Sequence, residues 1–146
     1  MRLACALLLG VGLLGCGGEA PYKGDKRYAV QGTVSFNGEP VHNGMIVFAG
    51  ESDPTKQFTG QGIILDGKYS IEEGKGPNGG KYQVLVRWSK PTGKTRKDPD
   101  TGETVDVVKE VIPKKYNEVT ELRADVGAGS TTFDFKLEGP APPAAK

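Results

Sequence analysis

Few side chains in this sequence can bind zinc tightly or pair a nucleophile with its base. Among 146 residues there are two cysteines, Cys5 and Cys16, and a single histidine, His42. A zinc site built from His and Cys needs three or four such ligands, and no serine stands in a G-x-S-x-G context. The chain is therefore predicted not to be an enzyme and not to hold a cofactor. An enzyme would instead require a concave pocket with convergent polar groups around His42.

An excess of charge of one sign is also missing. The chain has 19 Lys and Arg against 18 Asp and Glu, a formal net charge of +1. Such a balance gives no general attraction to nucleic acid, so nucleic acid is not an expected partner. Basic side chains do gather at Lys90, Lys94 and Lys97, within a stretch at 89–106 that is rich in Gly, Pro and charge. We expect an exposed loop or mobile hairpin there, with these lysines as candidate contacts for a partner.

The apolar run at residues 3–14 is too short to cross a membrane, since a transmembrane helix needs about 20 apolar residues. The run follows Arg2 and gives way to small residues just before Cys16. This order of a basic residue, an apolar run and small residues is typical of an export signal that is later removed. The sequence therefore predicts a signal peptide at 1–15.

The four residues LLGC, which end at Cys16, resemble the lipobox of bacterial lipoproteins. The resemblance implies that the chain is cut before Cys16, that Cys16 is acylated, and that the protein is held at a membrane by these lipids. Two or more acyl chains give stable anchoring. An ordinary cleaved signal and an uncleaved anchor are the alternatives. Gly17 follows the cysteine, so the resemblance favours the outer membrane or cell surface, and residues 16–27 are predicted to be a flexible tether.

The rest of the chain shows apolar residues at every second position, as in half-buried strands. The clearest case is KYQVLVRW, in which Tyr82, Val84, Val86 and Trp88 share a face. The Asp66-Gly67 pair predicts a hairpin with a tight type I′ turn. The same alternation recurs in VQGTVSF and in TTFDFKL.

No window has a helical apolar stripe, and 22 glycines with 10 prolines interrupt every long segment. We therefore predict an all-β fold: a single antiparallel β-sandwich of about seven strands at 28–137. The Pro- and Ala-rich end, residues 138–146, is predicted to be a disordered tail.

Several spaced motifs resemble the carboxypeptidase regulatory-like domains, which belong to the transthyretin-like (prealbumin-like) sandwiches. A G-x-V strand leads to a G-x-P-V turn, a D-G-x-Y hairpin follows, and a G-x-Y-x-V-x-V strand completes the core. In this chain the matching residues are Gly32, Val34, Gly38, Pro40, Val41, Asp66, Gly67, Tyr69, Gly80, Tyr82, Val84 and Val86. The resemblance covers roughly residues 28–137 and implies the fold, because its motifs are structural and not catalytic.

Three further features suggest ligand contacts. Trp88 and Tyr116 would form a carbohydrate platform if both rings were exposed and coplanar, whereas the alternation favours packing for Trp88. Leu85 stands among polar neighbours on the opposite face of the Trp88 strand and indicates a contact patch. Asp98, Asp100 and Glu103 offer hard oxygen ligands for Ca²⁺, although Asp-Pro and Thr-Gly pairs also form plain turns.

These observations predict a non-enzymatic lipoprotein of the cell envelope, exported and anchored through acylated Cys16, whose β domain is a binding or structural module. The expected partner, besides the membrane, is an envelope protein or glycan. The alternative is a carbohydrate-binding module at the cell surface.

Overall fold

The computed structural model describes residues 26–51 and 59–140, which form ten strands and two single-turn 3₁₀ helices. The predicted signal peptide, Cys16, most of the predicted tether and the last residues of the predicted tail lie outside these ranges. The strands are β1 (Val30–Phe36), β2 (Glu39–Pro40), β3 (Gly44–Gly50), β4 (Gly60–Leu65), β5 (Lys68–Ile71), β6 (Gly80–Arg87), β7 (Ser89–Lys97), β8 (Thr104–Glu110), β9 (Arg123–Val126) and β10 (Phe135–Leu137). The helices are η1 (Glu73–Lys75) and η2 (Lys114–Tyr116).

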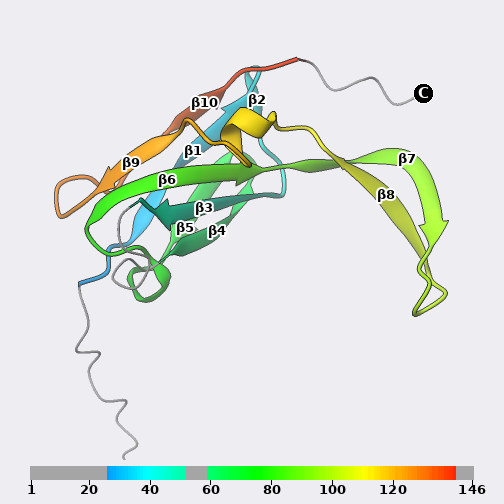
Figure 1. Cartoon of the computed structure of the whole chain (residues 1–146), viewed down its shortest axis with the longest axis horizontal. Helices are drawn as coiled ribbons and strands as arrows, with labels where there is room; N and C mark the ends of the chain where they lie inside the picture. The colour runs from blue at the N-terminus through cyan, green and yellow to red at the C-terminus, as the bar shows by residue number, and fades with distance from the viewer. Residues whose placement is uncertain (1–25, 52–58, 141–146) are drawn as a thin grey trace, which may run out of the picture.

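The strands form two sheets. The larger has the order β10-β1-β5-β4-β3-β6-β9, with β2 added beside β1, and the smaller consists of β7 and β8 (Figure 1). The prediction of an all-β fold is confirmed. The prediction of about seven strands, all antiparallel, needs correction, because the described part of the chain has ten strands and β10 runs parallel to β1.

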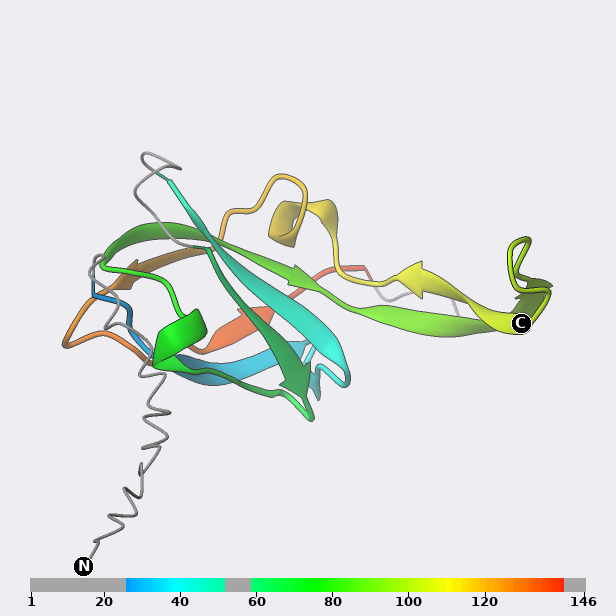
Figure 2. The same ribbon diagram turned by 90° about the horizontal axis from the view of Figure 1, so that it is seen from below.

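The larger sheet curls around its core into a half-barrel. Its two end strands, β9 and β10, are joined by residues 127–134 alone. Residues 127–130 of this connection fold back on themselves, because Gly127 N donates to the Ser130 carbonyl and Ser130 N donates to the Gly127 carbonyl. The connection is therefore too short to join the ends of a flat sheet of seven strands, and the sheet bends. Figure 2 shows the connection as an orange loop at the end of the domain away from the β7–β8 hairpin, leading from β9 to β10.

The parallel pairing of β10 with β1 follows from the strand directions. Five antiparallel pairings separate β9 from β1, so these two strands run in opposite directions, and β10, which runs opposite to β9, lies parallel to β1.

Alternate residues of the strands fill the interior, as the period of two predicts. Tyr82, Val84 and Val86 of β6 are each fully buried, and Phe48 of the neighbouring β3 is buried with them. Side chains of this size stabilise the fold by about 1.5 to 3 kcal/mol each when fully buried. Phe135 and Leu137 also face the core, which confirms the predicted inward face of the last strand.

Two tight turns take the backbone conformation that their sequence favours. Asp66 and Gly67 both have positive φ, 49° and 77°, between β4 and β5. Asn37 and Gly38 have φ of 50° and 81° between β1 and β2. Positive φ at both central residues is the mark of a type I′ turn, so the predicted Asp66-Gly67 turn is confirmed.

The stretch at 89–106, predicted to be a loop or hairpin, is an ordered hairpin. β7 continues β6 beyond Arg87 and pairs with β8, and the two strands extend away from the half-barrel (Figures 1 and 2). Near the root of this hairpin, contacts of the C-terminal segment continue two residues past Leu137. Asn37 Nδ2 donates to the Gly139 carbonyl at 3.0 Å, and Gly139 N donates to Asn37 Oδ1 at 3.1 Å.

Candidate functional site

The β7–β8 hairpin contains most of the predicted contact residues, and none of its strand residues is fully buried. Most of its side chains are exposed, on both faces, and Lys94 and Lys97 lie on its outer half. Val108, on β8, has 56% of its surface exposed. A two-stranded sheet that buries neither face contributes little to the core, so packing within the domain does not account for its size and position.

The root of the hairpin is fixed by Glu110. Its Oε1 accepts hydrogen bonds from the backbone N–H of Trp88 at 2.9 Å and of Ile112 at 3.0 Å. Val111 N also donates to the Trp88 carbonyl at 2.9 Å. These bonds join the beginning and the end of the hairpin at the point where both enter the core, and thereby set its direction.

Trp88 lies at this root and is buried, with 3% of its surface exposed. Lys90 Nζ lies 4.0 Å from the centroid of its ring and also contacts the Glu39 carboxylate at 2.9 and 3.1 Å. Lys90 therefore covers the indole ring and links the hairpin to β2. Of the three lysines that the sequence suggested as contacts, this one has a structural role.

Tyr116 is buried as well, with 8% of its surface exposed. It ends η2, and its hydroxyl donates to the Glu138 carbonyl at 3.2 Å and accepts from Glu138 N at the same distance. The carbohydrate interpretation required Trp88 and Tyr116 to be exposed and coplanar. Both are buried, so that requirement is not met.

The tip of the hairpin is a turn closed by Asp98. Asp98 Oδ1 accepts from the N–H of Asp100 at 2.9 Å and of Thr101 at 3.0 Å. These two backbone bonds, that from Thr101 first, hold the pKa of Asp98 below its ordinary value. Within residues 26–51 and 59–140, no three His, Cys, Asp or Glu side chains are grouped to hold a metal ion. The calcium interpretation of Asp98, Asp100 and Glu103 thus gains no support, and a turn accounts for their hydrogen bonds.

His42 pairs with the carboxylate at the Asp66-Gly67 turn. The distance from His42 Nδ1 to Asp66 Oδ1 is 2.7 Å, and 52% of the histidine side chain is exposed. An enzymatic role would need a concave pocket around this ring. A groove does exist on the domain, but His42 does not line it.

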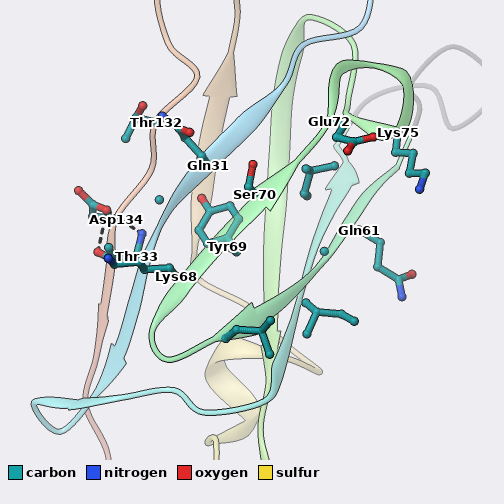
Figure 3. A pocket seen from close by; sticks show the side chains of 15 residues that line it. Gln31, Thr33, Gln61, Lys68, Tyr69, Ser70, Glu72, Lys75, Thr132 and Asp134 are labelled. Carbon is teal, nitrogen blue, oxygen red and sulfur yellow. Dashed lines mark hydrogen bonds between the residues drawn. The ribbon is translucent and has the colours of Figure 1, made fainter.

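That groove, of about 820 Å³, lies on the outer face of β1, β5 and β4 (Figure 3). Ser70 forms its floor on β5, with the longer side chains of Gln31 and Gln61 on either side. At one rim, Asp134 Oδ1 accepts from Thr33 N at 2.8 Å and from Thr33 Oγ1 at 2.7 Å. These bonds, the side-chain one first, lower the pKa of Asp134. The sequence did not indicate this groove, because outward polar residues on strands are ordinary and carry no signal of a hollow.

An apolar strip begins at the wall of the groove, which Ile63 and Leu65 line, and crosses the outer face. Ile63 and Leu65 of β4 have 63% and 60% of their surfaces exposed. Met45, opposite Ile63, and Val47, opposite Leu85, continue the strip across β3 to β6. Leu85, which the sequence indicated as a contact residue, is thus one end of a larger apolar surface.

Cys16 lies outside the described residues, so the structure does not bear on its lipidation. In the parts of the chain that are described, no helix combines the length and the apolar character needed to span a bilayer.

Comparison with models of protein families and with curated proteins finds no match. Among solved structures, the chain is similar to a crystal structure of a 9R-lipoxygenase from Cyanothece PCC8801, with 17% sequence identity and a TM-score of 0.39. The alignment covers 81% of this chain and 17% of the lipoxygenase, so the chain spans less than a fifth of that enzyme. A likeness of this size carries no argument about fold family or activity.

Proposed function

We propose that the chain is an exported lipoprotein of the cell envelope, held by acylated Cys16, in which the β domain is a non-enzymatic binding module. The partner, an envelope protein or glycan, is met by the β7–β8 hairpin. The observation that carries this proposal is the hairpin itself, which is ordered, fixed at its root by Glu110, and exposed on both faces.

The proposal also includes the fold family of the β domain. We assign the half-barrel to the transthyretin-like sandwiches, and two features support this assignment. The D-G-x-Y motif forms a type I′ hairpin with Tyr69 buried behind it, and the G-x-Y-x-V-x-V motif forms β6, between β3 and β9, with Tyr82, Val84 and Val86 buried. These local structures support the assignment.

The length of chain between Cys16 and the β domain is compatible with a domain held close to a membrane. From Cys16 to Lys26, the first described residue, the chain can span at most about 35 Å. A domain on such a tether stays near the membrane, and the hairpin gives it reach. Export also agrees with the composition, since no cysteine lies between residue 17 and the C-terminus.

Lipidation is tested by growing cells with an alkyne analogue of palmitate and measuring label on the purified protein. We expect label on the wild-type protein and on Cys5→Ser, whose cysteine is removed with the signal, but none on Cys16→Ser. Equal label on Cys16→Ser would exclude Cys16 as the anchor.

Binding is tested by cross-linking in intact cells, followed by mass spectrometry of the captured material. The control replaces residues 91–108 by Asn-Gly, which closes a type I′ turn directly on the paired Lys90 and Lys109. We expect the wild-type protein to capture a partner that the shortened variant does not. Equal capture by both would place the contact elsewhere on the domain.

A further inference from the structure

Strand β8 has an open edge. It pairs with β7 on one side, and within the described residues no strand pairs with its other side. Figures 1 and 2 agree that the hairpin stands clear of the half-barrel along most of its length. An open edge presents backbone groups that can hydrogen bond to a further strand.

The groups on that edge belong to Asp106 and Val108. Thr92 Oγ1 donates to the Val107 carbonyl at 2.7 Å, so the backbone of Val107 faces β7. In an antiparallel pair the backbone of successive residues faces alternate sides. The N–H and C=O of Asp106 and Val108 therefore point away from β7, toward the open edge. Pro91 stands opposite Val108, where its missing N–H weakens no bond within the hairpin.

The two edges of the hairpin differ. The free edge of β7 contains Pro91, and its register is interrupted between Pro91 and Thr95 by a bulge in which Gly93 has a φ of 75°. Proline and bulges are features by which proteins block edge pairing. β8, with the sequence TVDVVKE, has neither proline nor glycine, is regular, and is rich in β-branched residues. Of the two, β8 is the edge suited to accept a strand.

We infer that β8 accepts β8 of a second copy of this chain, antiparallel, with Val107 opposite Val107 of that copy. The inference rests on the proposed function, in which the hairpin is the contact element, and it names the edge and the occupant. A symmetric pair of antiparallel strands has its two-fold axis perpendicular to the sheet. Each residue of one β8 must therefore stand opposite a residue of the other β8 whose side chain is on the same face of the sheet. Three central registers satisfy this condition, centred on Asp106, Val107 or Val108.

Charge selects among the three registers. Centring on Asp106 places two carboxylates directly opposite each other, and centring on Val108 places Asp106 opposite Glu110. Like charges directly opposite destabilise a sheet. Centring on Val107 instead places Asp106 opposite Val108 and Val105 opposite Lys109, with no like charges opposed. The two Asp106 carboxylates are then diagonal neighbours.

The register is tested with cysteine variants of the full-length protein in membranes, oxidised mildly and analysed on non-reducing gels. Val107 would form a non-hydrogen-bonded pair with its copy, with Cα atoms about 4.5 Å apart, a distance that a disulfide can bridge. We expect Val107→Cys to give a covalent dimer. The matched control is Val105→Cys, on the same strand and face, whose two copies would lie about 14 Å apart. A Val107→Cys yield at least tenfold above the control supports the register. Equal yields, no dimer, or a cross-link to another protein would overturn it.

Edge pairing itself is tested by adding Val108→Pro to Val107→Cys. Proline removes the N–H that faces the second copy and leaves the bonds between β7 and β8 in place. We expect at least a tenfold lower dimer yield, whereas Val108→Thr, which keeps the N–H and the branching, should retain the yield. An unchanged yield with proline would overturn pairing through this edge.

The dependence of the dimer yield on salt concentration distinguishes this dimer from one that opposite charges hold together. Because the two Asp106 side chains repel each other, raising the ionic strength or substituting Asp106→Asn should increase the Val107→Cys dimer. A dimer that falls with salt would overturn the register. Capture of a different envelope protein through the hairpin, with Val107→Cys still monomeric, would leave the proposed function standing and overturn only this inference.

Discussion

Lys90 holds its ammonium group over the ring of Trp88, 4.0 Å from the centroid, while the same group contacts the carboxylate of Glu39. Trp88 belongs to the core, Glu39 to β2, and Lys90 to the hairpin. One side chain therefore connects the body of the domain with the arm that leaves it.

Replacing Lys90 by alanine should lower the free energy of unfolding by about 1 kcal/mol. The ring contact is worth roughly 0.5 to 2 kcal/mol, and the pair with Glu39 adds little because both side chains are substantially exposed. Urea unfolding followed by Trp88 fluorescence measures the change. Lys94→Ala, on the exposed part of the hairpin, is the control and should leave stability unchanged; equal effects of both would contradict a specific role for Lys90.

Fluorescence of Trp88 should be poorly quenched by iodide, because the side chain is buried. The chain has one tryptophan, so the signal is unambiguous. A variant with Trp88→Phe and Val108→Trp moves the fluorophore to an exposed position on the hairpin and should be quenched several-fold more strongly. Strong quenching of the wild-type protein would contradict the burial of Trp88 and would support the carbohydrate-binding interpretation instead.

Glu110→Ala should destabilise the root of the hairpin by about 1 to 3 kcal/mol, since it removes the acceptor of two partly buried N–H groups. Glu110→Gln keeps an acceptor oxygen and should lose less. Hydrogen exchange at the amides of Trp88 and Ile112 reports the effect directly. Unchanged protection of both amides in the alanine variant would show that Glu110 does not fix the hairpin.

Gly67 and Gly38 form a matched pair of turn positions. Both have positive φ, which costs a residue with a side chain about 1 to 2 kcal/mol. A Cβ on Gly67 would also lie 2.8 Å from Pro40 Cβ, whereas one on Gly38 would meet nothing within 4 Å. Gly67→Ala should therefore destabilise the domain more than Gly38→Ala, by roughly a further 1 to 3 kcal/mol. Equal losses of unfolding free energy would mean that the turn relaxes around Pro40.

Acid should loosen the contact between Asp134 and Thr33. The hydrogen bonds from Thr33 lower the pKa of Asp134 in the folded state, so the stabilisation is present above the ordinary carboxyl pKa and is lost as the pH falls through the lowered value. The chemical shift of the Thr33 amide, followed by NMR, should titrate at that lowered pKa. Asp134→Asn should abolish this titration; its persistence would assign the shift to another group.

Local features of the fold could be predicted from the sequence. The Asp66-Gly67 pair needs positive φ wherever it occurs in a hairpin, and the alternation around Tyr82 and Val84 defines the inward face of β6 whichever strands lie beside it. Such signals depend on residues close together in the chain.

Neighbours distant in sequence could not be predicted in the same way. The alternation of Phe135 and Leu137 indicates which side faces the core, but says nothing of the parallel partner β1. The ordered conformation of the hairpin could be predicted only in part, for a similar reason. The charged residues, Gly and Pro at 89–106 are typical of loops, whereas the order of the hairpin depends on the hydrogen bonds that Glu110 accepts at its root. Lys90 was expected to be exposed because nothing in the sequence places it over Trp88.

The bond from Thr33 to Asp134 joins residues 101 positions apart. Just beyond this bond β1 pairs with β10, the last strand of the described chain, so the sheet cannot close until β10 has been synthesised. Closure of so large a loop is slow compared with the formation of local hairpins. A nascent chain of this design keeps its sheet open until β10 emerges, which would suit the export that we propose for this protein.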